Sequence, residues 1–272
     1  MITTQLRRLS PDDTAPLQAL LDVDPVQNVY LRSELRAGGS GGGQWWGLGE
    51  PGRLRAVMMG GPLVVPCIPD LDDAERLAEA LVRQQPARML VGQRDQVVAL
   101  DRAWRSAAQA REARDPQPFL VLRRGRLAAI PAGQVRRGTT ADLDRLTVAA
   151  ADMHREEMGI DPLAIDPTGW RTRMGKLVQR GWSWVWTEGD RIVFKAELSA
   201  WTPEAVQIQG VYTAPAMRNR GIATAALASV CRDVLDQVPA CTLYVNHYNA
   251  AARAVYRRLG FEHVTDFATL FY

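Results

Sequence analysis

The stretch Gln207-Ile-Gln-Gly-Val-Tyr-Thr213, followed by Ala-Pro215 and then by Arg218-Asn-Arg-Gly-Ile-Ala-Thr224, decides the interpretation of this 272-residue sequence. The pattern predicts a strand that ends before a proline, a short loop and the start of a helix. One apolar face of that helix is indicated by residues at helical spacing, which are Ala223, Leu227, Val230 and Val234. We therefore expect a strand that leads through a short loop directly into a helix.

The start of this helix has the composition of a phosphate-binding site. The first amide N–H groups of a helix have no backbone partner, and the helix dipole adds positive potential there. Gly221 leaves room for a ligand to approach the backbone, and Ala223 keeps the next turn small. Thr224 offers a hydroxyl, while Arg218 and Arg220 supply positive charge. Together, these residues are expected to hold a pyrophosphate group.

The elements around this stretch indicate a mixed sheet. Helices are expected at Ala141–Met153 and Pro167–Arg180, and a Gly189-Asp190 hairpin joins two of the strands that follow. The expected strands are Gln134–Arg137 before these helices and Gly181–Thr187, Arg191–Ala200, Ala205–Tyr212, Cys241–Asn246 and His263–Tyr272 after them. Two further helices are expected between the later strands, at Arg220–Gln237 and Ala250–Leu259. This order predicts an α/β fold of the α+β type, with a mixed, mostly antiparallel sheet flanked by helices.

The first half of the chain shows a similar alternation of strands and helices, without a usable cofactor loop. Gly47-x-Gly49-x-x-Gly52 matches a dinucleotide-binding pattern, but Pro51 and a strand-like run follow it instead of a helix. We expect a two-lobed protein with a domain at residues 1–130 and a second domain at residues 131–272.

Composition excludes several classes of protein. Apolar residues make up 47% and charged residues 23% of the chain, which is typical of a folded protein. The three cysteines and three histidines are scattered, so neither a disulfide scaffold nor a metal site is expected. The sequence shows no secretory signal and no apolar run long enough to span a bilayer, which favours a cytoplasmic protein without membrane association. The basic residues form no stripe, so no nucleic-acid partner is expected.

Two motifs resemble a known superfamily. Arg218-x-x-Gly221-x-Ala223, placed after Val211-Tyr-Thr-Ala-Pro215, resembles the acyl-CoA signature of the Gcn5-related N-acetyltransferase (GNAT) superfamily. Downstream, Asn249-Ala-Ala-Ala-Arg-Ala-Val-Tyr256-Arg-Arg-Leu-Gly-Phe261 resembles a later helix of that superfamily. The resemblance covers about residues 133–272. The first half resembles the degenerate N-terminal region of tandem acetyltransferases found in actinobacteria and related bacteria.

The resemblance implies roles for individual residues. The strand before the loop would splay from its neighbour and pair with the pantetheine arm, and one of its backbone N–H groups would hold the oxyanion. Tyr256 would protonate the departing CoA thiolate. The cofactor-binding residues implied in this way are Val211, Tyr212, Thr213, Arg218, Asn219, Arg220, Gly221, Ile222, Ala223, Thr224 and Asn249.

Simpler roles compete with these. Asn249 is also a good N-cap for the helix that follows, and Tyr256 could be a packing residue. Gln207 and Gln209 cannot act as a base, and Glu197 on the preceding strand is either the catalytic base or an exposed or paired glutamate. Glu156 and Glu157, between the helices, could equally recognise a cationic substrate.

The implied activity is the direct transfer of an acetyl group from acetyl-CoA, the co-substrate, to a primary amine in a ternary complex, without a metal. The acceptor could be a small amine, an amino acid, an aminoglycoside, a thiol-sugar amine or a protein N-terminus. The protein would act as a monomer or homodimer. The alternative is an acyl-CoA-binding sensor or scaffold without turnover, because the Gln207–Gln209 strand lacks a carboxylate.

Overall fold

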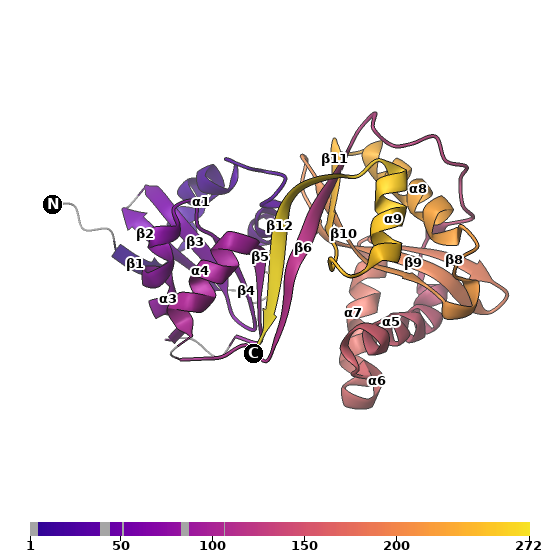
Figure 1. Ribbon diagram of the computed structural model, residues 1–272, viewed down its shortest axis with the longest axis horizontal. Coiled ribbons are helices and arrows are strands. Elements are labelled where there is room, and N and C mark those ends of the chain that lie inside the picture. The colour runs from indigo at the N-terminus through magenta and orange to yellow at the C-terminus, as the bar shows by residue number, and fades with distance from the viewer. Residues whose placement is uncertain (1–4, 39–43, 51, 83–86, 106) are drawn as a thin grey trace. The chain divides into compact units, whose positions relative to one another are not determined.

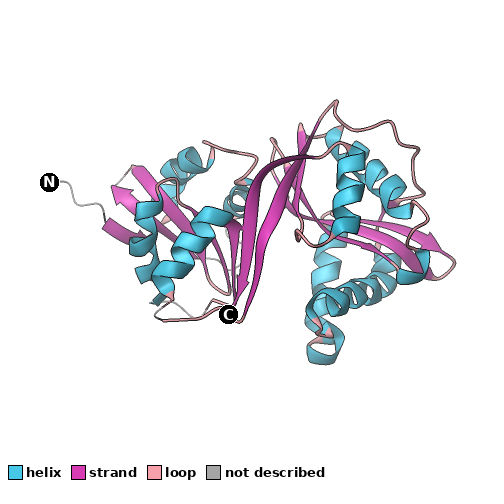
Figure 2. Cartoon of the chain, in the orientation of Figure 1, coloured by secondary structure: helices cyan, strands magenta, loops and turns pink. Residues whose placement is uncertain are grey.

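A computed structural model describes residues 5–38, 44–50, 52–82, 87–105 and 107–272. The chain divides into two compact units. The first unit comprises Met1–Leu120, Tyr244–Ala250 and His263–Tyr272, and the second comprises Val121–Leu243 and Ala251–Glu262 (Figure 1). In each unit, helices and strands form a mixed α/β arrangement (Figure 2), as the sequence predicted.

The strands of the first unit follow the order β1-β2-β3-β4-β5-β12-β6. Their bounds are β1 Gln5–Arg8, β2 Gln44–Glu50, β3 Arg53–Gly60, β4 Leu63–Cys67, β5 Met89–Gln93, β6 Glu112–Arg123 and β12 Glu262–Phe271. Most neighbouring strands are antiparallel, whereas β4 and β5 are parallel. The helices are α1 Thr14–Leu21, α2 Val29–Arg36, α3 Ala74–Val82 and α4 Arg94–Trp104.

Strand β3 shows how the first unit builds a core on both faces of its sheet. Successive side chains of a strand point to opposite faces. Ala56 and Met58 accordingly pack with apolar side chains of α3 and α4, whereas Val57 and Met59 pack with those of α1 and α2. A strand buried on both faces therefore explains the continuous apolar run in this part of the sequence.

The second unit has the strand order β11-β10-β9-β8-β7. Its strands are β7 Arg136–Arg137, β8 Ser183–Glu188, β9 Arg191–Trp201, β10 Val206–Thr213 and β11 Ala240–Tyr244. Its helices are α5 Leu143–Met158, α6 Pro162–Ile165, α7 Pro167–Gln179, α8 Ile222–Leu235 and α9 Ala250–Leu259. The β7 to β10 pairs are antiparallel, while β10 and β11 are parallel because α8 crosses between them.

Helices cover both faces of the second unit's sheet. Val185 of β8 packs with apolar side chains of α5 and α7. On the other face, the Trp184 indole donates a hydrogen bond of 2.9 Å to Asp233 of α8. Lys195 is the register partner of Val185, so it points to the face that α5 and α7 cover.

The same ion pair and turn stabilise the entry to the first helix of each half. In the first unit, Arg7 of β1 forms an ion pair with Asp13, whose carboxylate also accepts the Ser10 N–H at 2.9 Å. In the second unit, Arg136 of β7 forms an ion pair with Asp142 at 2.6 Å, and the carboxylate accepts the Thr139 N–H at 2.9 Å. Each arrangement is a capping box supported by an arginine. The recurrence indicates that the two halves share one structural plan.

The structure extends the sequence prediction in places. The helix expected at Ala141–Met153 runs to Met158, and the short α6 was not expected. The last strand, β12, pairs with β5 and so belongs to the first unit, a long-range pairing that leaves no local pattern in the sequence. The domain boundary expected near residue 130 stays a prediction. The two compact units of the structure are not continuous stretches of sequence, because each combines separate segments of the chain.

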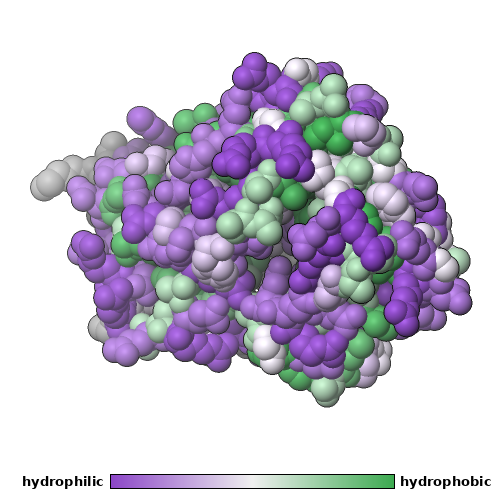
Figure 3. Space-filling view, turned by 45° about the vertical axis from the view of Figure 1, so that its right-hand side comes forward, coloured by the Kyte–Doolittle hydropathy of each residue, from purple (hydrophilic) through white to green (hydrophobic). Residues whose placement is uncertain are grey.

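The face of the molecule in Figure 3 is mostly hydrophilic, with smaller apolar patches. Among the described residues, no helix is long and apolar enough to cross a membrane.

The first prediction concerns the capping box of the second unit. The Arg136 guanidinium and the Thr139 N–H hold the pKa of the buried Asp142 carboxyl well below its ordinary value. Its contribution to stability is thus complete above the unfolded pKa of about 3.9 and is lost as the pH falls below it. We expect Asp142→Asn to lower the free energy of unfolding at pH 7 by about 3 kcal/mol, with the deficit shrinking below about pH 4.

Urea unfolding followed by circular dichroism measures this effect. Asp144→Asn is the matched control, because Asp144 lies in the first turn of the same helix, its side chain is 83% exposed and its ion pair with Arg171 lies at the surface. The control should change stability by less than about 1 kcal/mol. Equal losses for the two variants would contradict the role assigned to the capping box.

Candidate functional site

The site is built on β10, which is paired along one edge and partly unpaired along the other. On one side, β10 pairs with β9 from Val206 to Thr213. On the other side, its register pairs with β11 are Val206–Cys241 and Gln207–Thr242. Beyond Gln207, β10 continues without a further β11 partner in the part of the chain that the structure describes. The backbone N–H and C=O groups along this edge can therefore pair with an extended ligand.

A β-bulge interrupts β10 at the centre of this segment. Gln209 is the register partner of Glu197 and Tyr212 is that of Lys195, so Gly210 and Val211 both lie opposite Ala196. Gly210 has a φ of 60°, which favours glycine. A Cβ there would lie 2.8 Å from Glu197 Oε2 and 3.0 Å from Lys195 Nζ. The bulge therefore requires glycine both for its backbone conformation and for the space beside it.

The loop after β10 leads into an uncapped helix N-terminus. A short helical turn at Pro215–Met217 is followed by Asn219 and Gly221 with φ values of 62° and 76°. Gly221 is the N-cap of α8 without a side-chain hydrogen bond, and the Ala225 N–H donates to its carbonyl at 3.0 Å. The amides of Ile222, Ala223 and Thr224 thus precede the first bond within the helix. A Cβ at Gly221 would meet nothing within 4 Å, so a ligand can approach the backbone from that side. This geometry suits a phosphate group.

The two arginines of the loop lie near its ends. Arg218 Nε donates to the Thr213 carbonyl at 2.9 Å, and its Nη2 donates to Glu156 of α5 at 2.6 Å. Arg218 therefore ties the loop to the end of β10 and to α5. Arg220 is exposed, and its guanidinium contacts the Met217 sulfur at 3.6 Å. Of the two arginines, Arg220 has the side chain that can reach a phosphate without breaking an ion pair.

Tyr212 is buried beneath this ion pair. Burial and the nearby carboxylates of Glu156 and Asp152 raise the pKa of its phenol, so Tyr212 stays neutral at physiological pH. The Arg218 guanidinium lies 5.7 Å from the centre of its ring. Tyr212 thus packs against the Arg218–Glu156 pair at the end of β10. The role in cofactor binding that the sequence predicts for Tyr212 stays a prediction.

Tyr256 of α9 has a buried phenol. Its ring lies 5.7 Å from that of Phe261, and only 7% of the residue is exposed. Burial is the main cause that raises the pKa of Tyr256 far above its ordinary value, with smaller effects from Glu157 of α5 and Cys231 of α8. The phenol is therefore protonated at neutral pH, which is the form that a general acid needs.

Asn249 directly precedes α9 and lies in Tyr244–Ala250, a segment of the first unit. Its N–H donates to the Asn246 carbonyl at 2.9 Å. This position fits the N-cap role that the sequence left open, and the role in pantetheine binding stays a prediction.

Glu197, the candidate base, forms a buried ion pair. Lys195 Nζ lies 2.7 Å from Glu197 Oε1 and 3.0 Å from the Gly210 carbonyl oxygen. Lys195 is fully buried and Glu197 is 4% exposed. Glu197 is thus a paired glutamate, one of the two alternatives that the sequence left open. The action of Glu197 as a base stays a prediction.

The corresponding loop of the first unit has a different composition. β4 pairs with β5 at Leu63–Met89 and Val64–Leu90 and leads towards α3, as β10 leads to α8. The Ile68 N–H, however, is bound by the Gln96 side chain at 2.9 Å. The helical turn that follows is capped by Asp70, whose carboxylate accepts the Asp72 N–H at 3.2 Å, and it carries Asp72 and Asp73 in its first turn. These carboxylates repel phosphate where the second unit offers free amides.

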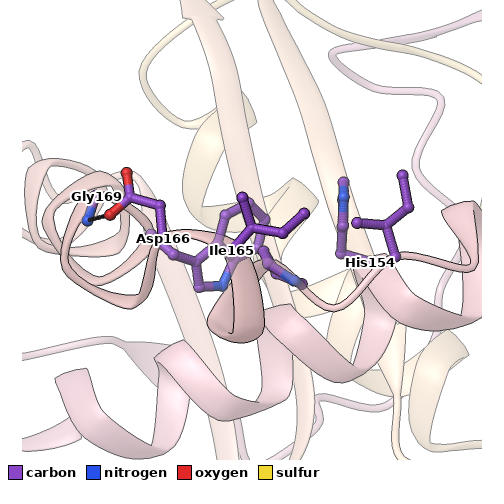
Figure 4. A pocket seen from close by; sticks show the side chains of 7 residues that line it. His154, Ile165, Asp166 and Gly169 are labelled. Atoms are coloured by element: carbon purple, nitrogen blue, oxygen red, sulfur yellow. Dashed lines mark hydrogen bonds between the residues drawn. The ribbon is translucent and has the colours of Figure 1, made fainter.

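A separate hollow of about 220 Å³ lies among α5, α6 and α7 (Figure 4). Its lining is mostly apolar and consists of His154, Ile160, Pro162, Ile165, Asp166, Gly169 and Trp170. Asp166 caps α7 by accepting the Gly169 N–H at 2.8 Å. None of the residues predicted to bind the cofactor lines this hollow.

Sequence reasoning missed Lys195 as part of the site. The signal was present, because the chain has only two lysines, Lys176 and Lys195, and Lys195 lies in an apolar strand two residues before Glu197. A lysine in such a strand must find an anionic partner if it is buried.

The second prediction tests the phosphate-binding loop. We expect Gly221→Val to fold and to lose at least tenfold in CoA affinity, because the branched side chain fills the open side of the loop. Gly189→Val is the matched control, since Gly189 also has a positive φ, of 55°, and an open side, but lies in the β8–β9 turn. Calorimetry measures the CoA affinity of both variants. Affinity equal to that of the control would remove Gly221 from the site.

Comparisons with known sequence families find a match in each half of the chain. The sequence model of the Acetyltransferase (GNAT) family matches residues 165–261, and that of a domain of unknown function (DUF4081) matches residues 43–146. No curated protein matches the chain.

Solved structures share the fold over nearly the whole chain. An acetyltransferase of the GNAT family from Colwellia psychrerythraea has a TM-score of 0.66 at 12% identity, covering 98% of this chain and 99% of its own. A GCN5-related N-acetyltransferase from Sphaerobacter thermophilus has a TM-score of 0.62 at 16% identity, covering 98% of this chain and 94% of its own. A tandem GNAT protein from the clavulanic acid biosynthesis pathway has a TM-score of 0.60 at 14% identity, covering 98% of both chains.

The family match contains the loop and the whole of α9, and the shared fold extends over both halves. Residues 165–261 therefore match the sequence model of the acetyltransferase (GNAT) family, and both halves of the chain share the fold of these solved structures.

Proposed function

We propose that the protein transfers an acetyl group from acetyl-CoA to a primary amine, by direct attack of the amine in a ternary complex. The observation that carries this proposal is the continuity of β10 with the uncapped start of α8. An unpaired strand edge and a set of free helix amides follow each other along one short segment. This combination fits a ligand with an extended arm and a pyrophosphate, which is the form of CoA.

Different residues of this segment would bind different parts of CoA. The β10 edge at Val211–Thr213 would pair with the pantetheine arm, and the amides of residues 219–224 would surround the pyrophosphate. Arg220 is free to turn towards the phosphates, while Arg218 would hold the loop in place through Thr213 and Glu156. Asn249 would contact the far end of pantetheine.

The chemistry requires a carbonyl that is polarised and a thiolate that is protonated. The amine nitrogen forms a bond to the thioester carbonyl carbon, and the carbon–sulfur bond then breaks. Tyr256 would donate its phenolic proton to the departing sulfur and would recover a proton from the attacking nitrogen, directly or through water. The raised pKa keeps this phenol protonated before the reaction. A backbone N–H of the β10 bulge would stabilise the negative charge on the carbonyl oxygen.

A second function remains in consideration because of Glu197. Its carboxylate is buried and bound to Lys195, so it is not free to accept a proton from an amine without disruption of the ion pair. An acyl-CoA-binding sensor that does not turn over would need no base. Release of free CoA in the presence of an amine panel separates the two functions, since a sensor binds acetyl-CoA without releasing CoA.

The third prediction concerns Tyr256. Tyr256→Phe removes only the hydroxyl, so folding and CoA affinity should change little. Turnover should fall by roughly 10²–10⁴-fold, the range for a positioned general acid. The loss should appear in kcat and in kcat/KM, because the proton is transferred in the transition state. Thiol detection of released CoA measures the rate with small amines, amino acids, aminoglycosides and peptides as acceptors.

Tyr248→Phe is the control for this experiment, since Tyr248 is an exposed tyrosine that precedes the same helix. It should keep the rate of the unaltered protein. A Tyr256→Phe rate within a few-fold of this control, with chemistry rate-limiting, would assign Tyr256 to packing alone and leave the CoA site in place.

A further inference from the structure

The buried pair of Lys195 and Glu197 has a third partner on the neighbouring strand. Lys195 Nζ donates to Glu197 Oε1 at 2.7 Å and to the Gly210 carbonyl oxygen at 3.0 Å. Glu197 Oε2 lies beneath Gly210, at 2.8 Å from the position of a Cβ there. Two charged side chains of β9 therefore enclose the bulge of β10 from the face that α5 and α7 cover.

A buried ion pair is weak evidence for a gain in stability. Removing two charges from water costs several kcal/mol for each ion, and apolar residues of similar volume are often equally stable or more stable at such positions. A buried ion pair instead fixes the geometry of the groups that it binds, if every partner is well placed. In this pair, the group that is bound beyond the two side chains is the Gly210 carbonyl.

The direction of that carbonyl determines the direction of the next amide. The Gly210 C=O and the Val211 N–H belong to one planar trans peptide unit, so they point in opposite directions. Because the carbonyl points to Lys195 Nζ, the Val211 N–H points away from Lys195. This amide lies past Gln207, which is the last β10 residue with a β11 register partner among the described residues.

We propose that Lys195 and Glu197 are positioning residues that orient the peptide unit of Gly210 and Val211, so that the Val211 N–H donates a hydrogen bond to the thioester carbonyl of acetyl-CoA. This role rests on the proposed function, because it requires acetyl-CoA at the β10 edge. It differs from the role of a catalytic base, since neither side chain exchanges a proton with the amine. The Glu197 carboxylate fixes the position of the Lys195 ammonium group, and this group fixes the direction of the Gly210 carbonyl.

The test measures polarisation of the bound carbonyl and needs no acceptor. Acetyl-CoA labelled with carbon-13 at the acetyl carbonyl is bound to the protein, and its carbonyl stretch is recorded by isotope-edited infrared spectroscopy. A hydrogen bond from Val211 should shift the stretch to lower frequency than in free acetyl-CoA. In Lys195→Met/Glu197→Leu, the shift should be lost, whereas the dissociation constant for CoA should stay within a few-fold, because the pyrophosphate loop is unchanged.

Glu197→Gln provides the discriminating variant. A glutamine oxygen can still accept a hydrogen bond from Lys195, so the carbonyl shift should remain close to that of the unaltered protein. The double variant with an undiminished carbonyl shift would overturn the proposal. A Glu197→Gln protein that loses the shift would overturn it too, because the hydrogen-bond acceptor for Lys195 is retained.

A second pair of variants serves if the double variant fails to fold. Gly210→Ala places a Cβ against Glu197 Oε2 and Lys195 Nζ, while Gly189→Ala introduces the same strain of a positive φ with no atom within 4 Å. The carbonyl shift should be reduced in Gly210→Ala and kept in Gly189→Ala. Equal shifts would contradict the proposal. Absence of acetyl-CoA binding to the unaltered protein would instead refute the proposed function itself, which separates the two failures.

Discussion

The pairing of β10 is the constraint on which the site depends. Its pairing with β9 runs from Val206 to Thr213 and is interrupted by the bulge at Gly210 and Val211, while the described pairing with β11 ends at Gln207 and Thr242. A strand edge that is left unpaired requires partners from water or from a ligand. The start of α8 lies directly after this edge and presents amides that need partners as well. One short segment thus combines both kinds of unsatisfied backbone, and the GNAT family match contains α8 and the end of β10.

The two halves of the chain share one structural plan but differ at the loop where we propose the CoA site. Both begin with an arginine-supported capping box, and both lead from a strand that is partly paired to a parallel neighbour into a helix. In the first half, however, Asp70, Asp72 and Asp73 surround the start of the helix, and Gln96 binds the Ile68 amide. Negative charge and a bound amide disfavour a pyrophosphate there. The difference between the halves lies in a few side chains at one loop and leaves the fold unchanged.

The local features of the site could be predicted from the sequence, because each depends on neighbouring residues. The order of strand, loop and helix, the glycine at the start of α8 and the α/β class all follow from short patterns, and the structure confirms them. The partners of Arg218 and Lys195 could not be predicted in this way. Arg218 reaches Glu156, which is distant in sequence, and Lys195 reaches Gly210 only because of the register of β9 and β10. The same holds for β12, whose pairing with β5 joins the end of the chain to the first unit. Long-range register depends on the whole core and leaves no local signature.

In the proposed function, the unpaired edge of β10 and the start of α8 form the single CoA site of the chain. Hydrogen–deuterium exchange of the intact protein, with and without saturating CoA, tests it most directly. We expect slower exchange of the amides at residues 208–213 and 222–224 when CoA is bound, and unchanged exchange at the corresponding segment of the first unit, residues 64–74. Protection of residues 64–74, or CoA binding that leaves β10 and α8 unprotected, would show that CoA binds elsewhere.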